Sequence, residues 1–158
     1  MIQRIQTLYI LLFCTILFIA SSLPFASLNI NNESLYFLYP TGWESTSSLD
    51  GLKVYPFYSG YLVAVSFGIL MLVNYKKRPK QLRYGMFSYF FVLLTIAYML
   101  FEVSNTLEIL LKNNSNLKYN IKYLYSTYLL ISSLPVIFLA NRAIKKDQKL
   151  VSSLDRLR

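Results

Sequence analysis

The chain has 158 residues, a formal net charge of +9, no histidine and one cysteine. Apolar residues make up 55% of it and charged residues only 15%, against roughly 25% charged residues in soluble globular domains. Without histidine or a second cysteine, the commonest general acid/base, the usual haem and zinc ligands and any intrachain disulfide are excluded. No nucleotide-binding loop sequence occurs. The sequence therefore predicts no catalytic, metal or cofactor site.

Charged residues are nearly absent from four apolar stretches, which we predict to be transmembrane helices. The stretches cover about residues 5–23, 57–74, 86–104 and 123–141. Each is long enough, or nearly so, to cross a hydrocarbon core of ~30 Å at 1.5 Å per residue. A soluble helical bundle is the alternative, but four such stretches in so short a chain leave too little polar surface to cover them. We predict an all-α membrane protein, a single domain over residues 1–158, forming an antiparallel four-helix bundle with an amphipathic cytoplasmic C-terminal helix.

The first apolar stretch resembles a signal peptide because Arg4 precedes it and small residues end it at 20–22. However, it exceeds the roughly 7–15 residues of a typical signal-peptide core, and Leu23 to Phe25 remain largely apolar. We interpret it as a retained span. Cys14, in its middle, is interpreted as a small apolar filler, since a desolvated thiol ionises poorly.

The predicted outer loop, residues 26–53, is the longest polar segment. Asp50 and Gly51 form a turn signal, and the segments 35–39 and 52–55 on either side allow a short β-hairpin. Trp43 and the loop tyrosines are expected to form an interfacial aromatic belt in preference to a ligand pocket.

Small residues recur every four positions in the second stretch, at Gly60, Ala64 and Gly68. This spacing places them on one helix face, where small side chains let membrane helices approach closely. We predict that this face packs against other helices of the same chain, with dimerisation as the alternative.

The second loop, residues 74–84, is short and basic, and Pro79 forbids a continuous helix through it. The third stretch is expected to continue as helix to Leu111. Glu102 is the acid closest to the bilayer, and it lies about 28 Å of helix beyond Arg83. This position predicts a solvated carboxylate at the outer interface, although ionisable residues at depth often mark ion paths.

Pro135 lies in the fourth stretch and cannot donate a backbone hydrogen bond, which predicts a kink. Transporters use broken helices to build binding sites near the middle of the membrane. One proline without a partner motif in another span favours a static kink.

The tail, residues 142–158, is predicted to be a basic amphipathic helix. Its apolar residues, from Ile144 to Leu157, lie broadly on one face. Its bases are expected to contact anionic lipid headgroups on the inner leaflet, or alternatively a partner protein. They are Arg142, Lys145, Lys146, Lys149, Arg156 and Arg158.

Twelve of the sixteen Lys and Arg residues fall on the side that holds both termini and the second loop. Because basic residues in short loops stay in the cytoplasm, both termini are predicted to be cytoplasmic. The same charges suggest contact with the lipid bilayer and its anionic headgroups. We do not expect nucleic-acid binding, because no pattern of stacking aromatic residues accompanies the bases.

The two ends of the chain resemble a known family. The segments are Met-Ile-Gln-Arg-Ile-Gln-Thr at 1–7 and Ala-Asn-Arg-Ala-Ile-Lys-Lys-Asp-Gln-Lys-Leu-Val at 140–151, followed by Asp-Arg-Leu-Arg at 155–158. They are similar to the domain-of-unknown-function family 4293, small four-span membrane proteins of Bacteroidota. The resemblance implies a bacterial inner membrane and supplies no catalytic or ligand residue.

These observations favour a protein that is not an enzyme and serves as an accessory or scaffold subunit of a larger membrane complex. A small transporter or channel for ions or small molecules is the alternative, motivated by Pro135 and Glu102. An enzyme would have to depend on Tyr, Ser and Lys side chains alone.

Overall fold

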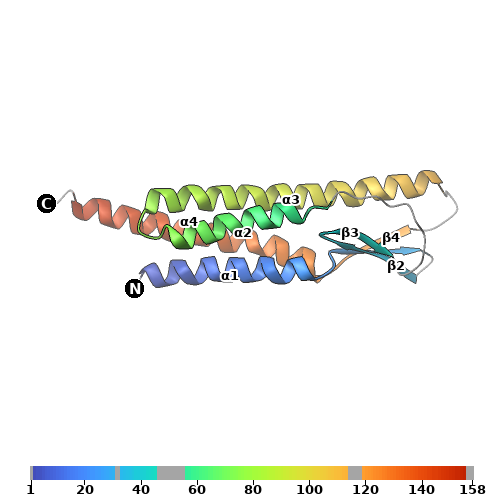
Figure 1. The fold of residues 1–158 in the computed structure, drawn as a ribbon, viewed down its shortest axis with the longest axis horizontal. Coiled ribbons are helices and arrows are strands. Elements are labelled where there is room, and N and C mark those ends of the chain that lie inside the picture. Colours follow the sequence, from blue (N-terminus) through green and yellow to red (C-terminus); the bar gives the residue numbers. More distant parts are fainter. Residues whose placement is uncertain (1, 31–32, 46–55, 114–118, 156–158) are drawn as a thin grey trace.

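The computed structural model describes residues 2–30, 33–45, 56–113 and 119–155, which form four helices and four strands (Figure 1). In chain order, the elements are α1 (Ile2–Ser22), β1 (Ala26–Ile30), β2 (Glu33–Tyr39), β3 (Gly42–Ser45), α2 (Tyr58–Val73), α3 (Arg78–Asn113), β4 (Tyr119–Tyr123) and α4 (Tyr125–Asp155).

The helices form an antiparallel bundle. Each helix packs against the next along the chain, and α4 packs back against α1. Figure 1 shows the chain ends and the α2–α3 turn at one end of the bundle, and the strands toward the other. In the turn, the Lys77 N–H donates to the Asn74 carbonyl (2.9 Å), and α3 then begins at Arg78. Pro79 lies in the first turn of α3, where its missing N–H breaks no helical hydrogen bond.

Three helices are long and apolar enough to cross a membrane, over Ile5–Ser22, Arg78–Lys112 and Tyr125–Ser152. The fourth, α2, has 16 residues, about 24 Å of helix against a core of ~30 Å. Three of the four predicted spans therefore reach full length. The backbone N–H groups of Phe57 and Tyr58 donate to the Pro40 carbonyl (2.9 and 3.2 Å), so α2 begins where the sheet ends.

The described chain is mostly helical, as predicted, but it also holds a four-stranded antiparallel sheet in the order β3-β2-β1-β4, so the all-α class needs correction. In the centre, β1 pairs with β2 on one side and with β4 on the other. In β2, Tyr36 and Leu38 are buried whereas Phe37 and Tyr39 are half-buried. This alternation is typical of a strand with one covered face, and the aromatic-belt interpretation overlooked it.

The predicted hairpin of the outer loop is correct in its first strand only. Residues 35–39 belong to β2, but they pair with β3 through a turn at Pro40 and Thr41. Gly42 ends this turn with φ 135°, a conformation that suits glycine. The predicted turn at 50–51 and the strand at 52–55 lie outside the described residues.

Phe25 joins the sheet to the bundle. Its N–H donates to the Leu38 carbonyl of β2 (2.7 Å). Its own carbonyl accepts hydrogen bonds from the Leu124 N–H and from the Thr127 hydroxyl, both at 2.7 Å. The end of α1, the start of α4 and the sheet therefore meet at one residue, whose ring is fully buried.

The bundle interior and the covered face of the sheet share an apolar core. Its largest fully buried side chains are Phe13, Phe25, Ile10, Leu17, Leu28, Leu38, Met71, Met99, Leu130, Ile137, Ile144 and Val92. Large apolar side chains also point outward from all four helices, for example Phe18, Val73, Phe101 and Phe138. Such an outer surface suits a hydrocarbon solvent.

One continuous helix, α4, runs from Tyr125 to Asp155. The described part of the tail, up to Asp155, is therefore a continuation of the fourth helix and not a separate helix. No Gly or Pro occurs between residues 136 and 155 to end the helix. Pro135 lies within it, and the Ser133 hydroxyl donates to the Leu130 carbonyl (2.7 Å) in the adjoining turn.

Candidate functional site

The predicted packing residues of α2 lie against two other helices of the same chain. A Cβ atom at Gly60 would overlap the Thr95 hydroxyl of α3. Ala64 is buried, and its carbonyl accepts a hydrogen bond from the Ser88 hydroxyl of α3 (2.9 Å). A Cβ at Gly68 would lie 2.9 Å from the Cys14 sulfur of α1.

Sequence reasoning missed a further close approach, at Gly85 of α3. A Cβ at this position would overlap the Asn141 side-chain oxygen of α4 and lie 2.9 Å from the terminal methyl of Met71. Gly85 thus lets α2, α3 and α4 converge. The available signal was a glycine directly before the apolar stretch that begins at residue 86.

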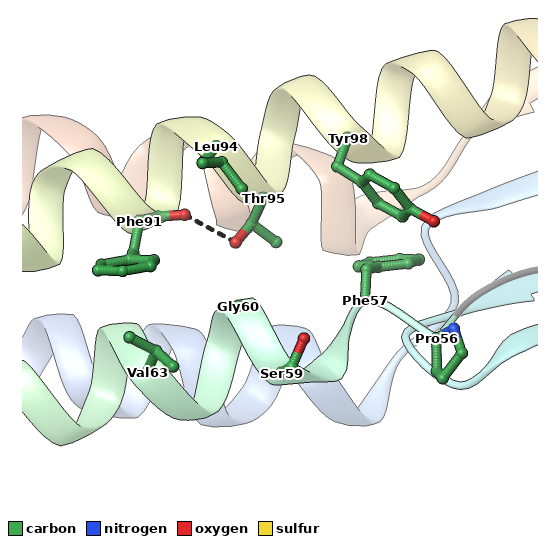
Figure 2. A pocket seen from close by; sticks show the side chains of 9 residues that line it. All are labelled: Pro56, Phe57, Ser59, Gly60, Val63, Phe91, Leu94, Thr95 and Tyr98. Atoms are coloured by element: carbon green, nitrogen blue, oxygen red, sulfur yellow. Dashed lines mark hydrogen bonds between the residues drawn. The ribbon is translucent and has the colours of Figure 1, made fainter.

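A groove of about 360 Å³ lies between α2 and α3 (Figure 2). We call it the α2–α3 groove. It is lined by Pro56, Phe57, Ser59, Gly60, Val63, Phe91, Leu94, Thr95 and Tyr98. Figure 2 shows the Thr95 hydroxyl directed along its own helix to the Phe91 carbonyl, at 2.7 Å. The walls are mainly apolar, so the groove suits an apolar group.

An aromatic cluster joins this groove to the sheet. The Phe25 ring lies 5.6 Å from the Phe57 ring and 5.9 Å from the Tyr61 ring, and Phe57 lies 6.4 Å from Tyr98. Edge-to-face and tilted ring pairs at such distances stabilise a core beyond the area they bury. The cluster fixes the sheet over the ends of α1 and α2.

Trp43 lies beside the core and not in a belt of solvent-facing rings. Its side chain is half-buried, and its indole N–H donates to the Thr106 hydroxyl of α3 (3.1 Å). The hydrogen bond connects β3 to the part of α3 that extends past the bundle. This extension confirms the predicted continuation of helix to Leu111.

Glu102 is buried, with 7% of its surface exposed, so the predicted solvated carboxylate is wrong. It lies one turn after Tyr98, whose side chain is a hydrogen-bond partner of the carboxyl. Its neighbours in α3, Val103 and Thr106, are also buried. The prediction failed because it measured only depth along the helix, whereas this part of α3 lies beside the sheet end, where Trp43 of β3 donates a hydrogen bond to Thr106.

The opposite end of the bundle is basic. Arg78 at the start of α3 forms an ion pair with Asp147 of α4, with 2.6 Å between Nε and Oδ2. Their side chains are only 24% and 11% exposed. Beside this pair lies a groove of about 560 Å³, lined by Lys76, Lys77, Arg78, Pro79, Lys80, Arg83, Gln148, Val151 and Ser152.

The predicted contact residues of the tail divide into two groups. Arg142, Lys145, Lys146 and Lys149 are exposed on α4. Arg156 and Arg158 lie outside the described residues. The predicted apolar face is partly covered by protein, because Ile144 is fully buried in the bundle core.

The chemistry of these features differs from one end of the bundle to the other. The sheet end offers hydroxyls and one buried carboxyl, whereas the opposite end offers exposed ammonium and guanidinium groups that suit anions. Among the residues the structure describes, no three His, Cys, Asp or Glu side chains gather closely enough to hold a metal ion. Anion binding is the chemistry that the arrangement supports most directly.

Comparison with known families gives a match over nearly the whole chain. The model of the family described as Domain of unknown function (DUF4293) matches residues 2–157, so the chain belongs to this family. A search of the curated proteins gives no match. The predicted resemblance is therefore confirmed at the level of the family.

Proposed function

We propose that this member of the DUF4293 family is a non-enzymatic accessory or scaffold subunit of a larger assembly in the bacterial inner membrane. The observation that carries the proposal is the filled interior of the bundle. Buried apolar side chains extend from Ile144 near the basic end to Phe25 at the sheet. A bundle filled by its own side chains suits packing beside other proteins, whereas transport by one copy needs a wet path between helices.

The proposed placement has all four helices crossing the membrane, with both termini and the α2–α3 turn in the cytoplasm. The bases around the Arg78–Asp147 ion pair support this orientation, because positive charge is retained on the cytoplasmic side. The short α2 would cross where the bilayer thins locally, at a modest energetic cost. The bilayer and its anionic headgroups are then the first partners of the chain.

Purification of the tagged protein from its native membrane in a mild detergent, followed by native mass spectrometry, tests the accessory role. We expect a stoichiometric complex with a larger membrane protein. Recovery of the chain without any stoichiometric partner would contradict the proposal.

A transporter is the second candidate, and the burial of Glu102 favours it. An ionisable residue inside a membrane-spanning bundle often belongs to an ion or proton path. Here the carboxyl lies in α3 next to the sheet, with Tyr98 as its hydrogen-bond partner. A proton path through this end of the bundle would have to include both groups.

Reconstitution into liposomes loaded with a pH-sensitive dye separates the two candidates. The accessory role predicts the same slow proton leak for the wild type and for Glu102→Gln. Glu108→Gln is the matched control, because Glu108 is an exposed carboxylate on the same helix. Fast flux in the wild type and in Glu108→Gln, but not in Glu102→Gln, would establish transport instead.

A further inference from the structure

A third groove, of about 500 Å³, lies between α3 and α4 near the basic end of the bundle. We call it the α3–α4 groove. Its α3 wall consists of Leu82, Met86 and Tyr89, which share one helix face. On α4, Phe138 is followed by Asn141, Arg142 and Lys145, again on one face. The groove therefore changes from apolar to basic along its length.

The apolar part lies within the predicted spans. Met86 is 59% exposed and Phe138 is 58% exposed, so both side chains point away from the bundle core into the surrounding medium. In a membrane that medium is hydrocarbon. An acyl chain fits against these side chains without desolvating a polar group.

The basic part begins where the fourth predicted span ends. Arg142 and Lys145 are exposed and lie three residues apart on α4. In the described part of the chain, the ion pairs join Arg78 to Asp147 and Lys112 to Glu108, and neither involves these two bases. Their charges are therefore available to an anion at the level of the headgroups.

Asn141, one of the residues that line the groove, packs against Gly85 of α3. The Asn141 oxygen is buried against Gly85, so α3 and α4 approach closely at the level where the groove turns from apolar to basic. The groove is then a shaped site and not only a charged surface.

We propose that the α3–α4 groove binds one anionic phospholipid, with its phosphate at Arg142 and Lys145 and an acyl chain along Met86 and Phe138. Basic pockets between transmembrane helices on the cytoplasmic side bind anionic headgroups by this combination of charge and apolar contact. A helix from a partner protein would fit the apolar wall but would leave both bases without a counter-charge. The inference rests on the proposed orientation and is independent of the accessory role.

The test uses the full chain, delipidated in a mild non-ionic detergent and titrated with phosphatidylglycerol under native mass spectrometry. We expect one bound lipid at low lipid concentration, and weaker binding of zwitterionic phosphatidylcholine. The double variant Arg142→Gln/Lys145→Gln should lose affinity for phosphatidylglycerol by about tenfold or more. The matched control, Lys146→Gln/Lys149→Gln, removes the same charge from the same helix outside the groove and should stay within about twofold of the wild type.

Two further arms identify the source of the phosphate. Glycerol 3-phosphate carries the phosphate without acyl chains and should not compete with the lipid. Phe138→Ala should weaken lipid binding, whereas Phe18→Ala, an exposed phenylalanine on α1, should not. Both are surface positions, so unchanged helical circular dichroism is expected for each variant.

Several results would overturn the inference. Equal losses in the two double variants would mean a diffuse basic surface. If phosphatidylcholine bound as tightly as phosphatidylglycerol, the charge of the lipid would not contribute to binding. Competition by glycerol 3-phosphate would indicate a site for soluble phosphate esters. A dimer mass that disappears in Arg142→Gln/Lys145→Gln would show that a second copy of the chain occupies the groove.

Discussion

The two ends of the bundle hold the same four helices together by different means. At one end lie a sheet built from segments far apart in the sequence and the buried rings of Phe25, Phe57 and Tyr61, which pack against one another. At the other end, an ion pair between Arg78 and Asp147 joins α3 to α4, and most of the surrounding bases remain exposed.

This difference between the two ends suggests that one end stabilises the fold and the other binds ligands. Burial of apolar rings contributes a large free energy that does not depend on a partner. A mostly buried ion pair contributes little net free energy, because desolvation offsets much of its Coulombic attraction. We therefore expect the sheet end to determine the stability of the fold and the basic end to determine what the protein binds.

The largest effect is expected at the sheet end. Phe25→Ala removes a fully buried ring and should lower the free energy of unfolding by about 3–5 kcal/mol. The matched control is Phe18→Ala, because Phe18 is 74% exposed on α1 and its loss should change stability little. Thermal unfolding in detergent measures both. Similar unfolding midpoints for the two variants would contradict the assignment of stability to the sheet end.

The next effect is expected between the two ends, where α2 packs on α3. Ala64→Leu should lower the free energy of unfolding by about 1–3 kcal/mol, because Ala64 is fully buried and the added carbons would overpack the contact between α2 and α3. Ser66→Leu is the control, since Ser66 is exposed on the same helix. A neutral result for Ala64→Leu in the same unfolding assay would mean that this face does not pack inside the chain.

The smallest effect is expected at the basic end. Asp147→Asn breaks the ion pair with Arg78 and should cost about 1–2 kcal/mol of stability, since both groups are mostly buried. Glu108→Gln breaks the exposed pair with Lys112 and should cost less than about 0.5 kcal/mol. Chemical unfolding of each variant gives the two values. A loss at Asp147 as large as that at Phe25 would reverse the assignment of stability to the sheet end.

The helices could be predicted from the sequence because they depend on local signals. Long apolar stretches, the break at Pro79 and the absence of helix breakers after Pro135 are each visible in a short window. The packing role of Gly60, Ala64 and Gly68 could be predicted for the same reason, since residues four positions apart lie on one face of a helix.

The sheet could not be predicted because its pairing is not local. The inner strand β1 is short and holds two polar residues, and its partner β4 follows only after two more strands and two helices. The burial of Glu102 was missed for the same reason, because its position along the helix axis says nothing of the tertiary contacts that bury it. Gly85 was missed because the residues it contacts, Met71 and Asn141, lie on two other helices.

The central claim is that the bundle crosses the membrane with its sheet end outside and its basic end in the cytoplasm. Single cysteines at Asn120 in β4 and at Ser152 in α4, in a Cys14→Ser background, test it with a membrane-impermeant maleimide on intact spheroplasts. Both positions are exposed, and they lie toward opposite ends of the molecule. The account predicts labelling of Asn120→Cys in intact spheroplasts and of Ser152→Cys only after permeabilisation. Labelling of Ser152→Cys from outside, or equal labelling of both positions before permeabilisation, would contradict it.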